Sequence, residues 1–358
     1  MPKNGTKLQA AQMLVLANAF WGLSFPVMKA MQMVHEPFQG SSWFVASSTI
    51  CVRFILASLI MLVLCVPTLR RLTRLEIWEG LGLGLFATAG LILQMDGLAY
   101  TSASTSAFLT QFYCLIIPVW VAISERRWPS RRTILCCLLV IIGVVILSEI
   151  LVDSGARTAA AHNGSQTTWR GEIETLLGSM IFTGQILWLQ RPKFSRNNVN
   201  HFSLVMFVVI AGASLPAAAL TAAPGQDWLA PYRLGSVWLF TGMLTLFCTL
   251  GAYVLMNRWQ PLLSATQAGL LYCLEPVFAS IFALFLPAWL SGVAGIQYGN
   301  EQLAFSLVAG GTLITLANAL MNLGEQRGPE PNDPAEQRTP ALSSIATAVP
   351  IENPEPRR

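Results

Sequence analysis

Long apolar stretches of the chain enclose three ionisable residues, Arg53, Asp96 and Glu275. A charged side chain at the centre of a bilayer costs about 2.5–3.5 kcal/mol on insertion scales, so such groups usually face a cavity or a partner. A carboxylate in that setting binds a cationic group or exchanges a proton, whereas a guanidinium binds an anion. These three residues are therefore the first candidates for chemistry inside the membrane.

Two interpretations of Glu275 stay open. It precedes Pro276, and a proline removes one backbone donor and breaks or kinks its helix. In the resulting polar niche, Glu275 either binds a cationic group or a proton, or is hydrogen-bonded to the backbone. For Asp96, near the predicted outer end of its span, a solvated interfacial carboxylate is favoured. For Arg53, a structural ion pair, with Asp96 as one candidate partner, is favoured over contact with an anionic substrate. Lys29 is expected to extend to the membrane interface.

Aromatic and amide side chains extend the candidate site. Trp21 and Phe25 are four residues apart, hence on one helix face, where they line a cavity or serve as packing and interface anchors. Amides inside apolar spans serve equally well as bonds between helices or as the lining of a pathway. The predicted substrate-binding residues are Trp21, Phe25, Arg53, Gln94, Gln111, Gln185 and Glu275, and the predicted coupling residues are Glu275 and Asp96.

Ten apolar stretches are predicted to be the membrane helices that position these side chains. Hydrophobic residues make up 54% of the chain and charged residues 11%, whereas soluble domains carry about 25% charged residues. A helix needs about 20 apolar residues to cross the hydrocarbon core. The predicted spans are 8–28, 44–66, 80–96, 103–124, 133–148, 175–190, 202–222, 235–256, 264–287 and 303–323. We therefore expect an all-α integral membrane protein with ten transmembrane helices.

Basic residues fall mostly on one side of these spans. With the N-terminus in the cytoplasm, 17 of the 22 Lys and Arg residues lie on the cytoplasmic side. The outer side has four, Lys29, Arg157, Arg170 and Arg233, and Arg53 lies inside a span. This asymmetry follows the positive-inside rule and predicts a multi-pass protein of the cytoplasmic (inner) membrane with both termini in the cytoplasm. The expected partners are the lipid bilayer and a small-molecule substrate rather than nucleic acid.

The spans occur as two runs of five, which indicates two halves of similar structure. An odd number of helices repeated in tandem lies in the membrane in opposite senses, as in the inverted repeats of secondary transporters. The best internal match pairs SASTSAFLTQFYCLIIPVWVA (102–122) with SATQAGLLYCLEPVFAS (264–280). Each segment has a proline in mid-membrane, and interrupted helices at matched positions point to a transporter binding site. We predict helix breaks at Pro118 and Pro276.

The rest of the sequence separates into a linker and a tail. Residues 1–150 and 172–323 form the two predicted halves, and residues 151–171 form a polar outer linker. The proline-rich segment 324–358 cannot bury enough surface to fold and is predicted to be a disordered cytoplasmic tail that transport does not need. The seven cysteines fall within spans without a CxxC pair, and the three histidines have no ligand spacing. We therefore expect no metal site, and no cofactor is predicted.

Five short motifs occur in the same order as in a known family. They are ANAFWGLSFPVMKAM (17–31), VRFILA (52–57), LQMDGLAYTSASTSAFLT (93–110), ATQAGLLYCLEPVFA (265–279) and NEQLAFSLVAGGTLI (300–314). Together they resemble the EamA-like family of the drug/metabolite transporter superfamily. The resemblance implies two EamA-like domains, ten helices, a central pathway, and export of small metabolites or xenobiotics. Asp96 departs from the family, which usually has an uncharged residue there.

The residues and the resemblance favour a secondary transporter, an alternating-access exporter of small metabolites or drugs, over an enzyme. The alternative is an integral membrane enzyme that acts on lipid-like substrates, which would need His, Asp or paired carboxylates clustered at one membrane face. A channel would need rings of like polar groups in an oligomer. The sequence has no GxxxxGK[ST] phosphate loop, so nucleotide-driven transport is not expected. A homodimer is left open, as is the choice between proton coupling and facilitated exit.

Overall fold

The computed structural model describes residues 4–38, 40–126, 128–147 and 169–302, with scattered residues between 305 and 320. Every regular element in this part of the chain is helical. Among the described residues, six helical segments are long and apolar enough to cross a membrane: Thr6–Phe38, Ser42–Cys65, Arg74–Ala99, Val199–Thr221, Gly235–Leu262 and Ala265–Ala283. The prediction of an all-helical membrane protein is confirmed.

The helices follow the predicted spans closely. The first half of the chain contains α1 (Asn4–His35), α2 (Ser42–Cys65), α3 (Arg74–Ala99), α4 (Ala103–Thr110), α5 (Tyr113–Glu125) and α6 (Arg131–Leu147). The second half contains α8 (Trp169–Leu189), α9 (Val199–Thr221), α10 (Gly235–Thr245), the π-helical turn η5 (Leu246–Gly251), α11 (Ala252–Trp259), α12 (Ala265–Tyr272), α13 (Glu275–Ala283) and α14 (Leu286–Ala294). Short 3₁₀ turns lie at Glu36–Phe38, Leu69–Arg71, Pro192–Phe194, Pro231–Arg233 and Gln260–Leu262.

Helices cover the first nine predicted spans. The tenth span, 303–323, falls mostly outside the described residues, so the number of ten stays a prediction. Most of the linker and the whole of the tail, 324–358, also lie outside them. The stretch before the tenth span contains a helix of its own, α14.

Side chains at several helix starts satisfy the backbone N–H groups that a helix leaves unpaired. The Thr73 hydroxyl accepts a hydrogen bond from the Glu76 N–H, and the Glu76 carboxylate accepts one from the Thr73 N–H, which forms a capping box before α3. Ser264 and Gln267 form the same box at the start of α12. Each box fixes where its helix begins, and therefore the rotation of the residues that follow.

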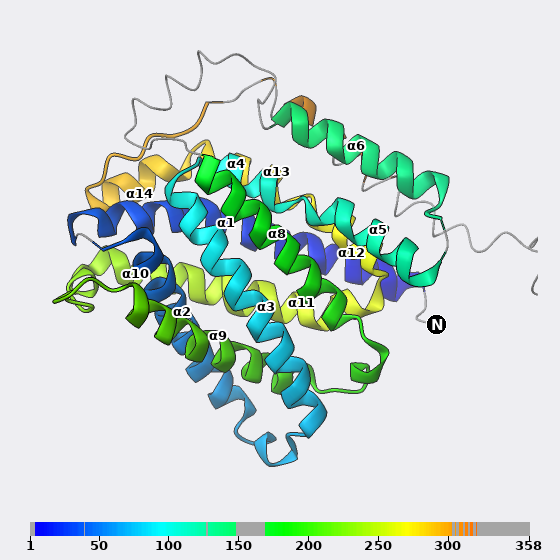
Figure 1. Cartoon of the computed structure of the whole chain (residues 1–358), viewed down its shortest axis with the longest axis horizontal. Helices are drawn as coiled ribbons and strands as arrows, with labels where there is room; N and C mark the ends of the chain where they lie inside the picture. Colours follow the sequence, from blue (N-terminus) through cyan, green and yellow to red (C-terminus); the bar gives the residue numbers. More distant parts are fainter. Residues whose placement is uncertain are drawn as a thin grey trace, which may run out of the picture.

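Glycines allow α3 and α8 to pack along most of their length (Figure 1). A Cβ added to Gly97 would lie 2.7 Å from the Gly171 carbonyl oxygen, and one added to Gly178 would lie 3.1 Å from the Gly90 carbonyl oxygen. Residue numbers rise along one helix as they fall along the other, so the two helices are antiparallel. Small residues at such contacts allow close backbone approach, which stabilises helix pairs in membranes.

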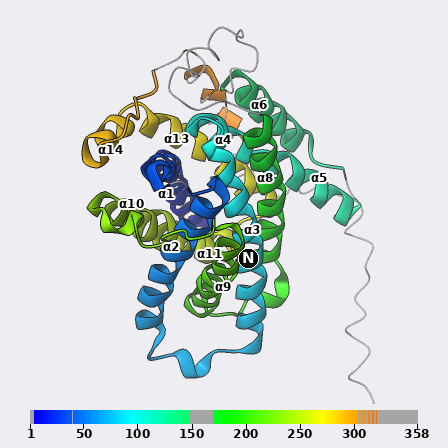
Figure 2. The same cartoon turned by 60° about the vertical axis from the view of Figure 1, so that its left-hand side comes forward.

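Helix α1 lies in the middle of the bundle. Figure 2, which looks nearly along it, shows α1 with α13 and α14 on one side and α10 on the other. Gly22 packs against α13, where an added Cβ would lie 2.6 Å from the Phe278 Cβ. The Asn18 amide donates a hydrogen bond of 3.0 Å to the Leu271 carbonyl of α12. Helix α1 therefore holds α12 and α13 in register with its own side chains.

Two of the described membrane segments are broken, and one break differs from the prediction. The first lies at Gln111–Phe112, between α4 and α5, so the break predicted at Pro118 is wrong, because Pro118 lies within α5. The second lies at 273–274, just before Pro276. Membrane helices tolerate an internal proline where neighbouring groups satisfy the freed carbonyl. Pro276, in contrast, occupies the first turn of α13, where a missing N–H removes no intrahelical bond.

Candidate functional site

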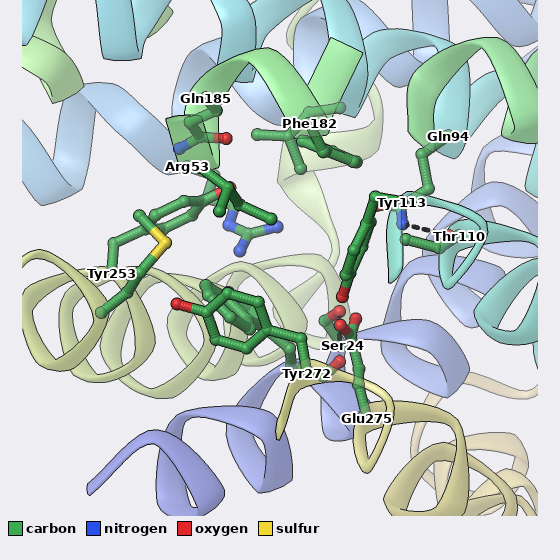
Figure 3. Close-up of a pocket in the computed structure, with 14 residues that line it drawn as sticks. Ser24, Arg53, Gln94, Thr110, Tyr113, Phe182, Gln185, Tyr253, Tyr272 and Glu275 are labelled. Atoms are coloured by element: carbon green, nitrogen blue, oxygen red, sulfur yellow. Dashed lines mark hydrogen bonds between the residues drawn. The ribbon is translucent and has the colours of Figure 1, made fainter. Parts of the chain in front are cut away.

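A cavity of about 60 Å³ lies between the helices of the two halves (Figure 3). It is lined by fourteen side chains, Trp21, Ser24, Arg53, Leu91, Gln94, Thr110, Tyr113, Phe182, Gln185, Ile186, Tyr253, Met256, Tyr272 and Glu275. Five of the seven residues predicted to bind substrate are among them: Trp21, Arg53, Gln94, Gln185 and Glu275. The other two are buried beside the cavity, because Phe25 packs in the hydrophobic core and the Gln111 amide bonds to the Ala107 carbonyl.

Twelve of the lining residues form six pairs across the two halves of the sequence. The members of each pair are 161 or 162 residues apart: Trp21 and Phe182, Ser24 and Gln185, Leu91 and Tyr253, Gln94 and Met256, Thr110 and Tyr272, Tyr113 and Glu275. Only Arg53 and Ile186 have no counterpart in the lining. The cavity is thus built from equivalent positions of both halves, although the side chains at those positions differ in chemistry.

The two broken segments contribute equivalent positions on either side of their breaks. At each break, two successive N–H groups bond to carbonyls three residues earlier. In the first, Gln111 bonds to Phe108 at 3.0 Å; in the second, Cys273 bonds to Leu270 at 3.1 Å. Thr110 and Tyr272 end the first half-helices, and Tyr113 and Glu275 begin the second ones. Because of the breaks, Thr110 and Tyr113 face the same cavity as their counterparts, Tyr272 and Glu275.

Arg53 enters the cavity from α2 and is almost completely buried. Its Nε donates to the Thr249 hydroxyl at 2.5 Å and its Nη2 donates to the Cys248 carbonyl at 2.9 Å. Both acceptors belong to the π-helical turn η5, a form that often occurs at functional sites. A guanidinium has five N–H donors, so donors remain for a ligand. The predicted ion pair with Asp96 is wrong: among the described residues, no carboxylate pairs with Arg53.

Glu275 begins α13 and is also buried. A carboxylate in the first turn of a helix is favoured by the partial positive charge of the helix N-terminus. Its side chain interacts with that of Gln111, and within the described part of the chain no Lys or Arg pairs with it. Arg53 and Glu275 enter the cavity from different helices (Figure 3). The site can therefore bind an anionic group at one place and a cationic group or a proton at another.

Aromatic rings form much of the remaining wall. The Trp21 ring lies edge-on to the rings of Tyr253 and Tyr272, with centroids 5.4 and 5.5 Å away. Tyr113 packs edge-on against Tyr272 with centroids 6.3 Å apart. The Tyr272 hydroxyl donates to the Gln260 side chain at 2.7 Å, which holds its ring in place. Such walls suit flat, apolar or cationic groups.

Asp96 and Lys29 lie outside the cavity, and both differ from their predicted surroundings. The Asp96 side chain is fully buried against α8 rather than solvated, and its Oδ2 accepts a hydrogen bond of 2.6 Å from Arg170 Nη2. The Lys29 ammonium is buried rather than extended to water, and it donates to the Leu98 and Thr101 carbonyls at 2.9 and 3.1 Å. Both side chains are buried because other helices pack against the C-terminal end of α3.

Sequence reasoning missed nine lining residues, Ser24, Leu91, Thr110, Tyr113, Phe182, Ile186, Tyr253, Met256 and Tyr272. The internal repeat contained the signal for most of them. The match of Pro118 to Pro276 is four residues out of register with the structure, in which Gln111 and Cys273 occupy equivalent positions at the two breaks. When the two halves are aligned at their breaks, Tyr113 is the residue equivalent to Glu275.

The cavity is small in this conformation. Pockets for drug-sized ligands measure about 300–1,000 Å³, whereas a void needs only about 10–15 Å³ to hold a water molecule. A cavity of about 60 Å³ holds a few waters or part of a small ligand. Among the described residues, no cluster of His, Cys, Asp or Glu is arranged to hold a metal ion.

Comparison with known proteins identifies the class of this protein. Residues 8–149 match the model of the EamA-like transporter family. An uncharacterized transporter of Archaeoglobus fulgidus is 24% identical over 280 residues, which are 78% of this chain and 78% of that protein. A solved structure described only as the crystal structure of a protein has a TM-score of 0.60 at 16% identity, covering 89% of this chain and 98% of that chain. At that identity it bears on the fold alone.

The chain is therefore a multi-pass membrane protein of the transporter class. The resemblance found in the sequence is confirmed, since residues 8–149 match the model of the EamA-like transporter family.

Proposed function

We propose that this chain is a secondary transporter that exports small metabolites or drugs across the cytoplasmic membrane by alternating access. Its two five-helix halves act as inverted repeats, and the cavity between them is the substrate site. The observation that carries the proposal is the lining of that cavity by six pairs of residues at equivalent positions of the two halves. A site on the axis between inverted repeats can open to either side as the halves rock against each other.

Helix contacts between the halves also occur in matched sets. The contact of α1 with α11 corresponds to that of α8 with α3, the contact of α1 with α12 to that of α8 with α4, and the contact of α1 with α13 to that of α8 with α5. In the centre, α2 packs on its counterpart α9, and the broken segments pack on each other, α4 on α13 and α5 on α12. In this last contact, the first half-helix of each broken segment packs on the second half-helix of the other. The two segments therefore run in opposite directions, which supports inverted repeats.

The charges of the cavity support a polar organic substrate. Arg53 offers a guanidinium with donors to spare, Glu275 offers a buried carboxyl group, and the aromatic rings offer flat apolar surface. In this proposal Glu275 binds the cationic part of the substrate or a proton, and Arg53 binds an anionic part. Both termini then lie in the cytoplasm, the tail 324–358 takes no part in transport, and a homodimer is not required for a pathway within one chain.

A membrane enzyme acting on lipid-like substrates fits the cavity less well. The described cavity residues contain one carboxyl group and no histidine or cysteine. General acid–base chemistry usually needs two groups that can exchange protons with the substrate. The transporter is therefore the better account of this site.

Mass spectrometry of the growth medium tests the proposal. Cells would express the intact chain, the Glu275→Gln variant, or Glu172→Gln, a control that neutralises a carboxylate away from the cavity; a fourth culture carries the empty vector. We expect metabolites that accumulate outside cells with the intact chain and with Glu172→Gln, but not with Glu275→Gln or the vector, at equal protein levels in the membrane. Equal export by Glu275→Gln would refute the role of Glu275. Export would be refuted if cells with the intact chain and cells with the empty vector behaved alike, both in the metabolites of the medium and under drug challenge.

A further inference from the structure

A second group of buried ionisable residues lies at the predicted outer ends of α3 and α8, apart from the cavity. Arg170 of α8 donates through Nη2 to Asp96 of α3 at 2.6 Å and through Nε to Glu174 of its own helix at 2.8 Å. Asp96 is fully buried, and Glu174 is nine-tenths buried. Arg170 is partly exposed and also stacks on the Tyr100 ring, 4.3 Å from its centroid. One cation thus stands between two carboxyl groups.

The two carboxyl groups have more acceptors than the described residues supply donors. Asp96 Oδ1 and Glu174 Oε2 are both buried, and neither has a hydrogen-bond donor in the described part of the chain. The Asp96 and Glu174 side chains nevertheless lie within hydrogen-bonding reach of each other. Ionised carboxylates only accept hydrogen bonds, so a bond between two carboxyl groups requires a proton on one of them. An unprotonated pair would leave two buried oxygens facing each other without a donor, an arrangement that proteins rarely keep.

The other charged groups that the structure describes near this pair are already engaged. On α1, the Lys29 ammonium is bonded to carbonyls at the end of α3. At the end of α3, the Tyr100 hydroxyl bonds to Arg170 and to Ser42 at the start of α2. On α8, Arg170 contacts the pair, and it is the one cation among the described residues that does so. One positive charge against two carboxylates leaves a net charge of −1, and one added proton makes the group neutral.

We propose that Glu174 binds one proton and donates it in a hydrogen bond to Asp96, and that this hydrogen bond holds the predicted outer ends of α3 and α8 together. The two helices belong to different halves of the chain. They touch through Gly97 and Gly171 next to the carboxyl pair, so they cannot separate there without breaking the pair. At 1.5 Å per residue, Glu174 lies about 12 Å along α8 from the cavity residue Phe182.

The proton links external acidity to the conformation of the transporter. When the pair is protonated, the carboxyl–carboxyl hydrogen bond and both Arg170 bonds hold the helix ends together. When pH rises and the proton leaves, two carboxylates face each other, their repulsion opposes the contact, and the ends separate more readily. The consequence for transport rests on the proposed function, in which separation of α3 and α8 at this end opens the cavity to the outside. The proton site itself does not depend on it.

Hydrogen–deuterium exchange of the full chain in lipid nanodiscs tests the proposal without a transport substrate. Protection factors, corrected for intrinsic exchange, would be measured from about pH 5 to about pH 9 for peptides at the start of α8. Loss of one linked proton changes an equilibrium by up to about tenfold per pH unit. We therefore expect the wild type to lose protection about tenfold or more as pH rises. Glu174→Gln, whose amide donates to Asp96 in place of the proton, should keep high protection throughout.

Two further variants make the result decisive. Glu172→Gln removes a neighbouring carboxylate that is not part of the pair and should follow the wild type. Asp96→Asn removes the ion pair with Arg170 and should lower protection at every pH. Protection in the wild type that does not change with pH, or that falls equally in Glu174→Gln, would overturn the proposal. Because no export is measured, a chain that exports nothing but shows this pH dependence would refute the proposed function and leave the proton site intact.

Discussion

The contact of α1 with α13 can be tested by adding one methyl group, in the variant Gly22→Ala. Gly22 of α1 is buried where the two helices touch, and a Cβ added there would lie 2.6 Å from the Phe278 Cβ and 2.7 Å from the Ala279 nitrogen. It would also lie 3.0 Å from the Glu275 carbonyl oxygen. Carbon atoms in contact prefer separations of about 3.5–4.0 Å, so Gly22→Ala must push α13 away by roughly 1 Å.

The expected magnitude follows from overpacking. Extra methyl groups in a packed interior cost about 1–3 kcal/mol. The shift also moves Glu275, and misplacement of a binding group by about 1 Å can lower a rate about a hundredfold. Gly22→Ala should therefore lower the free energy of unfolding by about 1–3 kcal/mol and reduce transport by more than the loss of folded protein accounts for.

Gly212→Ala is the matched control. Gly212 lies inside α9, and an added Cβ there would have no heavy atom within 4 Å. Alanine is favoured over glycine in a helix by about 0.5–1 kcal/mol, so this variant should be as stable as the wild type or slightly more stable. Thermal unfolding of the purified variants in detergent and transport in cells would be compared. If Gly22→Ala were as harmless as Gly212→Ala in both assays, the described α1–α13 contact would be refuted.

Two further predictions concern Arg53 and the tail. Arg53→Lys keeps the charge but cannot bond to both Thr249 and Cys248 in the geometry of a guanidinium. Because each bond to a charged group contributes about 1.5–3 kcal/mol, we expect transport to fall at least about tenfold. Unchanged transport would contradict the assigned role. Deletion of residues 329–358 should leave transport unchanged, measured by export at equal membrane levels, whereas a clear loss would show that the tail contributes.

The positions of the helices followed from the sequence because apolar stretches of the required length leave few alternatives in a bilayer. The break before Pro276 was predicted because a proline removes one backbone donor and breaks or kinks its helix. The same rule gave a wrong prediction at Pro118. The break at Gln111–Phe112 is set by the packing of α4 and α5 against α13 and α12, and the local sequence does not show which segments pack together.

The site was predicted in part for the same reasons. Trp21, Arg53, Gln94, Gln185 and Glu275 were selected because polar or aromatic groups stand out in apolar helices, and they line one cavity. The partners of charged groups were not predicted. Asp96 pairs with Arg170, 74 residues away, and Arg53 bonds to a π-helical turn, 195 and 196 residues away. Such partners depend on which helices are neighbours in space.

Thiol accessibility tests most directly the claim that matched positions of two inverted halves form one cavity with alternating access. Ser24→Cys and Gln185→Cys occupy equivalent positions in the two halves and both line the cavity. Each would be introduced singly after replacement of the seven native cysteines. A membrane-impermeant thiol reagent would be applied from one side at a time, with the buried core position Phe25→Cys as the control. The account predicts that both cavity cysteines are labelled from either side, while the control is not. Labelling of a cavity cysteine from one side only would contradict it.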